Sequence, residues 1–214
     1  MSRPPRSPRA SQPSSAHSGQ GRVRIVGGRW RNTRLVVPDL PGLRPTGERV
    51  RETVFNWLMP VLPGARVLDL FAGSGALGLE AVSRGANSAT LVERDLDLAA
   101  LLHRQVARLD AGSQVQVVQA DALYWLAQLG QGNYDLVFVD PPFAAGLWEP
   151  VLAILPARLT QTAWLYLESP VEVVPALPGE WQLHREGTAG EVRYALYRRA
   201  AGTLRSDLNS TIDA

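Results

Sequence analysis

The sequence of 214 residues contains neither cysteine nor lysine. Without cysteine, disulfide frameworks and thiolate metal sites are excluded, and three scattered histidines show no metal-ligand spacing, so we expect no metal. No apolar run approaches the ~20 residues that a membrane-spanning helix needs. The basic N-terminus is not followed by the apolar segment of a signal peptide. These absences predict a cytoplasmic protein that holds no metal and enters no membrane.

The absence of lysine means that all 22 basic residues are arginine, and their distribution is uneven. Eleven of them lie within residues 1–51, where only Asp39 and Glu48 are acidic. Arginine binds phosphate through a planar, two-pronged guanidinium, so this distribution is typical of nucleic-acid contact. Residues 1–21 are rich in Ser, Pro and Arg and cannot bury enough apolar surface to fold, so we expect a disordered basic tail there.

Apolar patterning predicts a small hairpin followed by alternating strands and helices. The hairpin comprises strands at 23–26 and 35–37, and a helix capped by Thr46 ends at Leu58. Further strands are expected at 66–70, 89–92, 115–118, 134–139 and 163–167, and helices at 75–84, 96–109, 122–129 and 147–155. The last two strands, at 181–185 and 192–198, are separated by a short glycine-containing turn and predict an antiparallel hairpin.

This alternation predicts an α/β protein with a parallel, doubly wound sheet. With the C-terminal antiparallel hairpin, the pattern is that of the seven-stranded, Rossmann-like sheet of class I S-adenosylmethionine-dependent methyltransferases, preceded by a small N-terminal β-hairpin extension. The predicted organisation is a disordered basic tail at 1–21, a hairpin and connector at 22–45, a catalytic domain at 46–199 and a flexible C-terminal tail at 200–214.

A glycine-rich segment, Asp69 to Gly78, follows a predicted strand and opens a helix. It contains the pattern G-x-G-x-x-G, and Glu93 lies twenty residues after Gly73, the spacing of an acid that hydrogen-bonds ribose hydroxyls. This motif alone does not separate a nicotinamide cofactor from S-adenosylmethionine, because both carry adenosine.

Two acids and the chain length favour S-adenosylmethionine. The Asp69 carboxylate suits the methionine ammonium group and would repel a pyrophosphate, and Asp121 can accept a hydrogen bond from the adenine amino group. The chain is too short for a dehydrogenase with a separate substrate domain. Each acid could instead cap a helix, which suits Asp121 and Asp95 well. The predicted cofactor contacts are Asp69, Phe71, Ala72, Gly73, Ser74, Gly75, Glu93, Asp121 and Ala122.

The segment Asp140-Pro141-Pro142-Phe143 follows an apolar strand at its carboxyl end, where open α/β sheets bind ligands. The two prolines give a stiff turn that can point the Asp140 carboxylate and the Pro141 carbonyl into a cleft, with Phe143 as a stacking face for a base. An exocyclic amine is a poor nucleophile because its lone pair is delocalised, and two acceptors on its N–H bonds favour a pyramidal, reactive nitrogen. The alternative is a strand-ending turn with Phe143 in the core.

The sequence resembles the RsmD family of bacterial 16S ribosomal RNA guanine-N2 methyltransferases, from about residue 22 to 199. The motifs that carry the resemblance are Arg24-Ile-Val-Gly-Gly-Arg-Trp30, Leu43-Arg-Pro-Thr46, Arg49 to Leu58, Asp69 to Glu80 and Asp140 to Phe143. The resemblance implies S-adenosylmethionine as methyl donor and, as target, the guanine numbered 966 within small-subunit particles. It also implies that Asp140 to Phe143 hold the base and that Thr46 to Arg51 lie beside the methionine end or the base.

The predicted N-terminal hairpin is expected to dock RNA. Strand alternation puts Arg22 and Arg24 on one face, with Val23 and Ile25 on the other face against the catalytic domain. The alternative is a solubilising edge hairpin. The predicted RNA contacts are Arg22, Arg24, Arg29, Arg31, Arg34, Thr46, Arg49 and Arg51.

Three other functions remain open on the residues alone. An adenine-N6 DNA or RNA methyltransferase would share the cofactor residues and the pocket, although a sequence-specific DNA enzyme usually carries a recognition domain. A nicotinamide oxidoreductase is favoured only by the glycine pattern, and an RNA-binding protein with a vestigial fold is disfavoured by the intact pocket. An ionised Asp140 accepts hydrogen bonds only, so it fits the two adjacent donors of guanine better than adenine, whose amine lies beside an acceptor.

Overall fold

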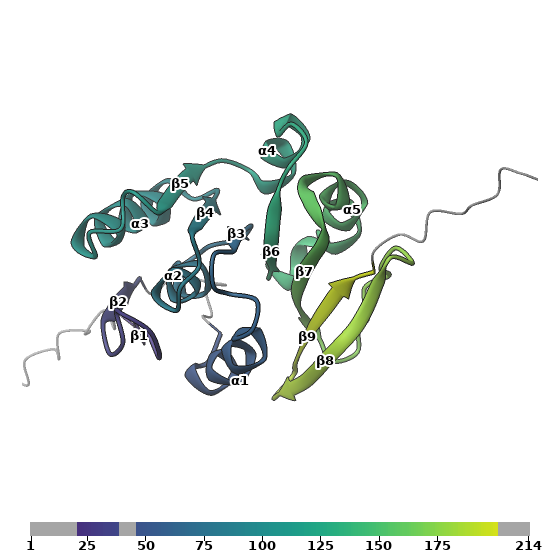
Figure 1. Cartoon of the computed structure of the whole chain (residues 1–214), viewed down its shortest axis with the longest axis horizontal. Coiled ribbons are helices and arrows are strands. Elements are labelled where there is room, and N and C mark those ends of the chain that lie inside the picture. The colour runs from purple at the N-terminus through teal and green to yellow at the C-terminus, as the bar shows by residue number, and fades with distance from the viewer. Residues whose placement is uncertain (1–20, 39–45, 201–214) are drawn as a thin grey trace, which may run out of the picture.

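The computed structural model describes residues 21–38 and 46–200, so the predicted tails, except Gly21 and Ala200, and residues 39–45 of the predicted connector lie outside the described residues. A seven-stranded sheet has the order β5-β4-β3-β6-β7-β9-β8, and β1 and β2 form a separate hairpin (Figure 1). The strands are β1 (Gly21–Arg24), β2 (Arg34–Val37), β3 (Arg66–Asp69), β4 (Ser88–Glu93), β5 (Val115–Gln119), β6 (Tyr134–Val139), β7 (Leu159–Pro170), β8 (Trp181–Ala189) and β9 (Val192–Arg199). The helices are α1 (Glu48–Leu58), α2 (Ala76–Ser83), α3 (Leu96–Arg108), α4 (Ala122–Gln128) and α5 (Trp148–Ile154), with short 3₁₀ turns at Phe143–Ala145 and Leu155–Arg158.

The strands from β5 to β7 are parallel, and β9 pairs antiparallel with both β7 and β8. This arrangement confirms the predicted α/β class, the seven-stranded sheet and its C-terminal antiparallel hairpin. The chain runs outward from β3 to β5 and then returns to β6 on the other side of β3. The strand order therefore reverses between β3 and β6, which is where open α/β sheets bind ligands. Within residues 21–38 and 46–200, no helix is long and apolar enough to cross a membrane.

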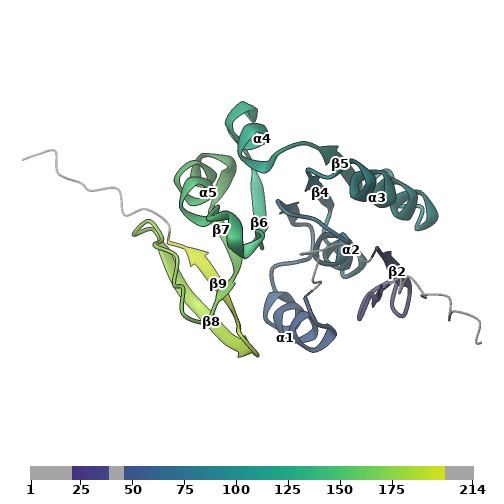
Figure 2. The same ribbon diagram turned by 180° about the vertical axis from the view of Figure 1, so that it is seen from behind.

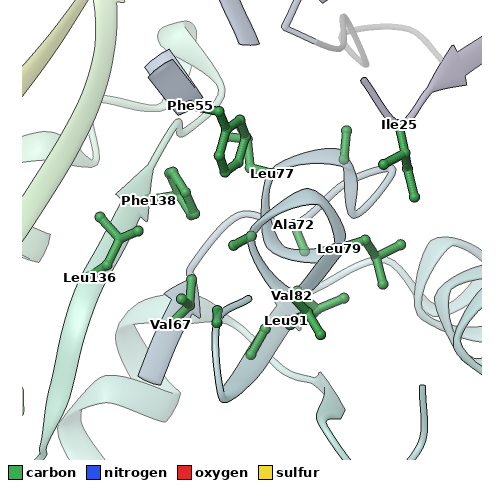
Figure 3. Close-up of a cluster of buried hydrophobic side chains, with 14 of the residues drawn as sticks. Ile25, Phe55, Val67, Ala72, Leu77, Leu79, Val82, Leu91, Leu136 and Phe138 are labelled. Atoms are coloured by element: carbon green, nitrogen blue, oxygen red, sulfur yellow. The ribbon is translucent and has the colours of Figure 1, made fainter. Parts of the chain in front are cut away.

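Helices cover both faces of the sheet, and strand β6 therefore buries apolar side chains on both of its faces. Leu136 and Phe138 point into a core shared with α1, α2 and α3, whereas Val137 and Val139 point into one shared with α4 and α5. Figure 3 shows Phe55 of α1 beside Phe138, with ring centroids 5.9 Å apart. The glycine loop leads into α2 on the first face, and the N-terminal hairpin packs against the same helix.

The N-terminal hairpin packs on α2 at the opposite end of the molecule from β8 and β9 (Figures 1 and 2). Val23 pairs with Leu35 in the β1–β2 ladder, and both side chains are buried, whereas Arg22 and Arg24 are exposed. The predicted alternation of the two faces is therefore confirmed. Strand β1 begins at Gly21 and ends at Arg24, two residues earlier than the predicted 23–26.

A buried ion pair attaches this hairpin to the catalytic domain. Arg51 of α1 and Glu80 of α2 are both 0% exposed, and Arg51 Nη1 lies 2.6 Å from Glu80 Oε2. The Glu80 carboxylate also accepts the backbone N–H groups of Val26 and Gly27 and pairs with Arg84 at 2.8 Å. Arg51 in turn donates to the carbonyl of Arg24.

The structure contradicts two expectations about the first helix. Arg51 is not an RNA contact, because it lies on the same helical face as Val54, Phe55 and Leu58 and is fully buried with them. Thr46 does not cap α1, whose N-cap is Gly47 without a side-chain hydrogen bond. The Thr46 hydroxyl instead donates to Glu168 Oε1 across 2.7 Å, on the distant strand β7.

We predict that Glu80→Leu lowers the free energy of unfolding by about 3–5 kcal/mol, because it leaves the buried Arg51 charge unpaired. The backbone amides of Val26 and Gly27 lose their acceptor as well, so their hydrogen exchange should accelerate. Urea unfolding and amide exchange measure the two effects. The control is Arg24→Gln, which breaks the ion pair between Arg24 and Glu48. These two side chains are 50% and 44% exposed, so the loss of this pair should lower the free energy of unfolding by less than about 1 kcal/mol. Equal losses of stability in both variants would contradict the prediction.

Candidate active site

A pocket of about 1160 Å³ lies at the carboxyl ends of the parallel strands, where the strand order reverses. It brings together the glycine loop, the acids at the carboxyl ends of β3, β4 and β5, and the turn after β6. The predicted site residues that line it are Thr46, Asp69, Phe71, Ala72, Gly73, Ser74, Glu93, Asp121, Ala122, Asp140, Pro141, Pro142 and Phe143. Gly75, also predicted to bind a cofactor, is not among the described lining residues.

Two glycines of the loop serve the packing of α2. Gly75 has φ 75°, in the left-handed region, and a Cβ there would lie 2.6 Å from a methyl carbon of Leu102. A Cβ on Gly78 would lie 2.2 Å from a methyl carbon of Leu91 on β4. Gly78 therefore allows the close approach of α2 to β4, and Gly75 allows the left-handed turn beside α3. The loop leaves Gly73 and Ser74 at the pocket surface.

The Glu93 carboxylate is anchored at the pocket by the chain itself. Its Oε2 accepts the N–H of Gly73, and its Oε1 accepts the N–H of Asp95, both at 2.8 Å. A carboxylate has about four acceptor positions, so two of them stay available for ribose hydroxyls. The ribose contact stays a prediction, but the position and fixed orientation of Glu93 fit that role.

The two other predicted cofactor acids differ in burial, because Asp121 is exposed and Asp69 is buried. Asp121 caps α4, because its Oδ1 accepts the N–H of Tyr124 at 3.0 Å, and it also lines the pocket. The capping role, which the sequence left open, is therefore present beside the predicted adenine contact. Asp69 is 3% exposed, and its Oδ2 accepts the N–H of Gly78 at 2.9 Å. Burial, with the nearby charge of Glu93, raises the pKa of Asp69 to about 7.

The turn after β6 presents its side chains to the pocket. Asp140 is partly exposed there, and Phe143 is 36% exposed, with its ring centroid 5.8 Å from that of Trp148. Phe143 is therefore not a core residue, and the alternative interpretation of this turn is wrong. Burial, followed by the negative charges of Glu168 and Asp69, raises the pKa of Asp140 well above its usual value. A hydrogen-bond donor placed here would favour the ionised carboxylate.

Glu168, at the end of β7, is a pocket residue that the sequence analysis missed. Its side chain is 5% exposed, and its Oε1 accepts hydrogen bonds from the Tyr166 hydroxyl at 2.6 Å and from Thr46. The predicted strand ended at 167, so this acid was not grouped with those at the other strand ends. Burial raises the pKa of Glu168, although both hydrogen bonds oppose that rise.

Comparisons with known proteins give the same fold and a specific family. The model of a family described as conserved hypothetical protein 95 matches residues 23–198. Ribosomal RNA small subunit methyltransferase D of Escherichia coli (strain K12) is 52% identical over 188 residues, which cover 86% of this chain and 94% of that protein.

Two solved structures extend the comparison. The putative methyltransferase yhhF from Escherichia coli has 50% identity and a TM-score of 0.78, over 85% of this chain and 100% of that one. An RNA methyltransferase from Salinibacter ruber, in complex with S-adenosyl-L-homocysteine, has a TM-score of 0.59 over 78% of this chain and 100% of that one. At 15% identity, the latter shows the fold alone. The predicted class I fold and the resemblance to the RsmD family are confirmed.

We predict that Asp69→Asn makes folding less sensitive to pH. Because the pKa of Asp69 is about 7 in the folded protein and near 3.8 when unfolded, its contribution to stability falls as the pH rises from about 4 to about 7. Asparagine can still accept the N–H of Gly78. Relative to the wild type, the variant should therefore gain roughly 2–4 kcal/mol between pH 4 and pH 8, at about 1.4 kcal/mol per unit of pKa shift.

Urea unfolding of both proteins at pH 4 and pH 8 gives this difference directly. The exposed Asp110→Asn is a control for the removal of one carboxylate, because asparagine also tolerates the left-handed backbone there, with φ 52°. An Asp69→Asn variant whose stability changes with pH as the wild type does would show that this carboxylate is ionised throughout.

Proposed function

The chain belongs to the family described as conserved hypothetical protein 95, and on that premise we propose that it transfers a methyl group from S-adenosylmethionine to the exocyclic N2 amine of a guanine in 16S ribosomal RNA. The observation that carries this proposal is the single pocket that joins the cofactor acids to the Asp140 turn. The name of the 52% identical relative supports the methyltransferase class and the small-subunit substrate. The guanine numbered 966, within small-subunit particles in the cytoplasm, is the target that the family resemblance implies.

The charge of the pocket fits S-adenosylmethionine better than a nicotinamide dinucleotide. Among the described lining residues, Arg94 is the basic one, and the acids are Asp69, Glu93, Asp95, Asp121, Asp140, Glu168, Glu172 and Glu191. This acidic lining attracts a sulfonium and an ammonium group and repels a pyrophosphate. Asp69 would face the ammonium, Glu93 the ribose and Asp121 the adenine.

The residues of the turn after β6 orient the amine. S-adenosylmethionine, when bound, supplies a methyl group that its sulfonium already activates. The Asp140 carboxylate and the Pro141 carbonyl accept hydrogen bonds from the amine, which frees the nitrogen lone pair, and Phe143 supports the base from its exposed ring. The raised pKa of Asp140 makes its carboxylate a stronger base than an ordinary aspartate, so Asp140 is suited to take the proton that leaves the nitrogen.

The N-terminal hairpin would hold the RNA outside this pocket. Its buried face anchors it to α2, and its arginine side chains Arg22, Arg24, Arg29, Arg31 and Arg34 are exposed, as is Arg49 of α1. Arg24 pairs with Glu48 at 2.7 Å, and Arg29 donates to Gln114 and lies 4.1 Å from the Trp30 ring. Phosphate contacts on this surface would position the strand while one base leaves its stack and enters the pocket.

We predict that Asp140→Ala lowers methyl transfer on small subunits by about a hundredfold or more, because the variant lacks one preorganised acceptor of the amine. S-adenosylhomocysteine affinity, measured by calorimetry, should stay within about twofold, because the cofactor acids are untouched. Mapping the methylated nucleotide in the wild-type reaction identifies the target base. Glu149→Ala removes an exposed acid of α5 and is the control. Near-normal turnover of Asp140→Ala would remove this residue from the mechanism.

We predict that the double variant Arg22→Gln, Arg31→Gln weakens binding to small subunits and lowers the salt dependence of that binding. The slope of log affinity against log salt should fall by up to about 0.7–0.9 for each phosphate that the variant no longer neutralises. The control, Arg104→Gln with Arg185→Gln, removes the same charge from exposed positions outside the hairpin. Equal effects of the two double variants would show that only net charge matters and would contradict a docking role.

A further inference from the structure

Two carboxyl groups, those of Asp140 and Glu168, lie beside each other in the wall of the pocket. Strands β6 and β7 are parallel neighbours, and their register pairs Val139 with Leu167. The next residues along the two strands, Asp140 and Glu168, therefore lie side by side and point to the same face of the sheet. Both line the pocket, and the charge of Glu168 contributes to the raised pKa of Asp140.

The Glu168 carboxylate is held in a single orientation. The Tyr166 hydroxyl and the Thr46 hydroxyl both donate to the same oxygen, Oε1, at 2.6 Å and 2.7 Å. Among the residues that the structure describes, no hydrogen-bond donor reaches Oε2. Glu168 Oε2 is not among the buried polar atoms without a partner, so it is open to the pocket and can accept a hydrogen bond from a donor of a ligand there.

The surroundings of the two carboxyl groups act differently on their pKa values. Tyr166 and Thr46 stabilise the charged form of Glu168 and oppose the effect of burial on its pKa. For Asp140, burial and the negative charges of Glu168 and Asp69 all raise the pKa. Glu168 is therefore the member of the pair whose charged form the protein stabilises with hydrogen bonds.

The Watson–Crick edge of guanine matches this pair of acids, because N1–H and the N2 amine are adjacent donors. Adenine places an acceptor, N1, beside its amine. We propose that Glu168 selects guanine by accepting the N1–H through Oε2, while Asp140 holds the N2 amine that is methylated. This inference rests on the proposed function and adds a specificity-determining residue to it. Adenine would direct its N1 lone pair at the carboxylate, which the site rejects.

The variant Glu168→Gln tests the assignment because it exchanges an acceptor for a donor with little change of shape. The two hydroxyl donors retain the amide oxygen at the Oε1 position, so the amide NH₂ faces the pocket. The probe is 2-aminopurine, which carries the same amine as guanine but has an N1 acceptor in place of N1–H. Small subunits are reconstituted with guanine or 2-aminopurine at the mapped position, and kcat/KM is measured for each.

The wild type should prefer guanine over 2-aminopurine by about a hundredfold or more. Glu168→Gln should be at least about a hundredfold slower on guanine and should methylate 2-aminopurine as well as or better than guanine. Affinity for S-adenosylhomocysteine, measured by calorimetry on the same preparations, should be unchanged. Misfolding would lower the activity on both substrates and this affinity together, so reversal of the preference identifies base selection.

Thr46→Val provides a second variant in case Glu168→Gln folds poorly. It removes one donor to Oε1 but keeps the charge of Glu168, so the guanine preference should narrow by about tenfold while cofactor affinity holds. A wild-type enzyme that methylates both bases equally, or a Glu168→Gln variant that keeps the guanine preference, would overturn this inference and leave the proposed function standing. A wild-type enzyme that methylates neither base would overturn the proposed function itself.

Discussion

The buried ion pair of Arg51 and Glu80 connects three segments that are distant in the sequence. Glu80 receives the hairpin amides, and Arg51 donates to the carbonyls of Arg24 and Thr46. Two charges with no exposed surface are tolerated only when their hydrogen-bonding groups are satisfied. Each of these bonds reaches a different segment. The two buried charges therefore keep all of their partners only while the hairpin is packed against the start of α1. The Thr46 side chain then reaches Glu168, which places one wall of the pocket under the same constraint.

Positively and negatively charged side chains gather on different parts of the molecule. Arginine side chains are exposed on the N-terminal hairpin, and carboxylates line the pocket between β3 and β6. Phosphate groups are attracted to the first surface and repelled by the second. In the proposed function, a nucleic-acid strand would dock along the hairpin, and the N–H donors of a base edge would face the carboxylates of the pocket. The target base would then have to leave its stack.

Much of the fold and of the site could be predicted from the sequence, because both depend on local patterns. The period of apolar residues predicted every strand of the sheet, and the glycine loop and the Asp-Pro-Pro-Phe turn marked the carboxyl edge where ligands bind. Parallel strands bring these ends together whatever lies between them. Hence Asp69, Glu93, Asp121 and Asp140 meet in one pocket although up to 71 positions separate them in the sequence.

The roles of Arg51, Thr46 and Glu168 were not predicted, because each is set by a partner from a distant part of the sequence. Arg51 was assigned by its charge, although its spacing from Val54 and Leu58 already placed it on the buried face of α1. Thr46 has the residue type of a helix cap, yet its hydroxyl bonds Glu168, 122 positions later. An arginine buried against glutamate, like Arg51, holds segments of the chain together, whereas an exposed arginine is available to bind phosphate. Burial and the partner of the side chain therefore separate residues of the same type, and the tertiary structure supplies that partner.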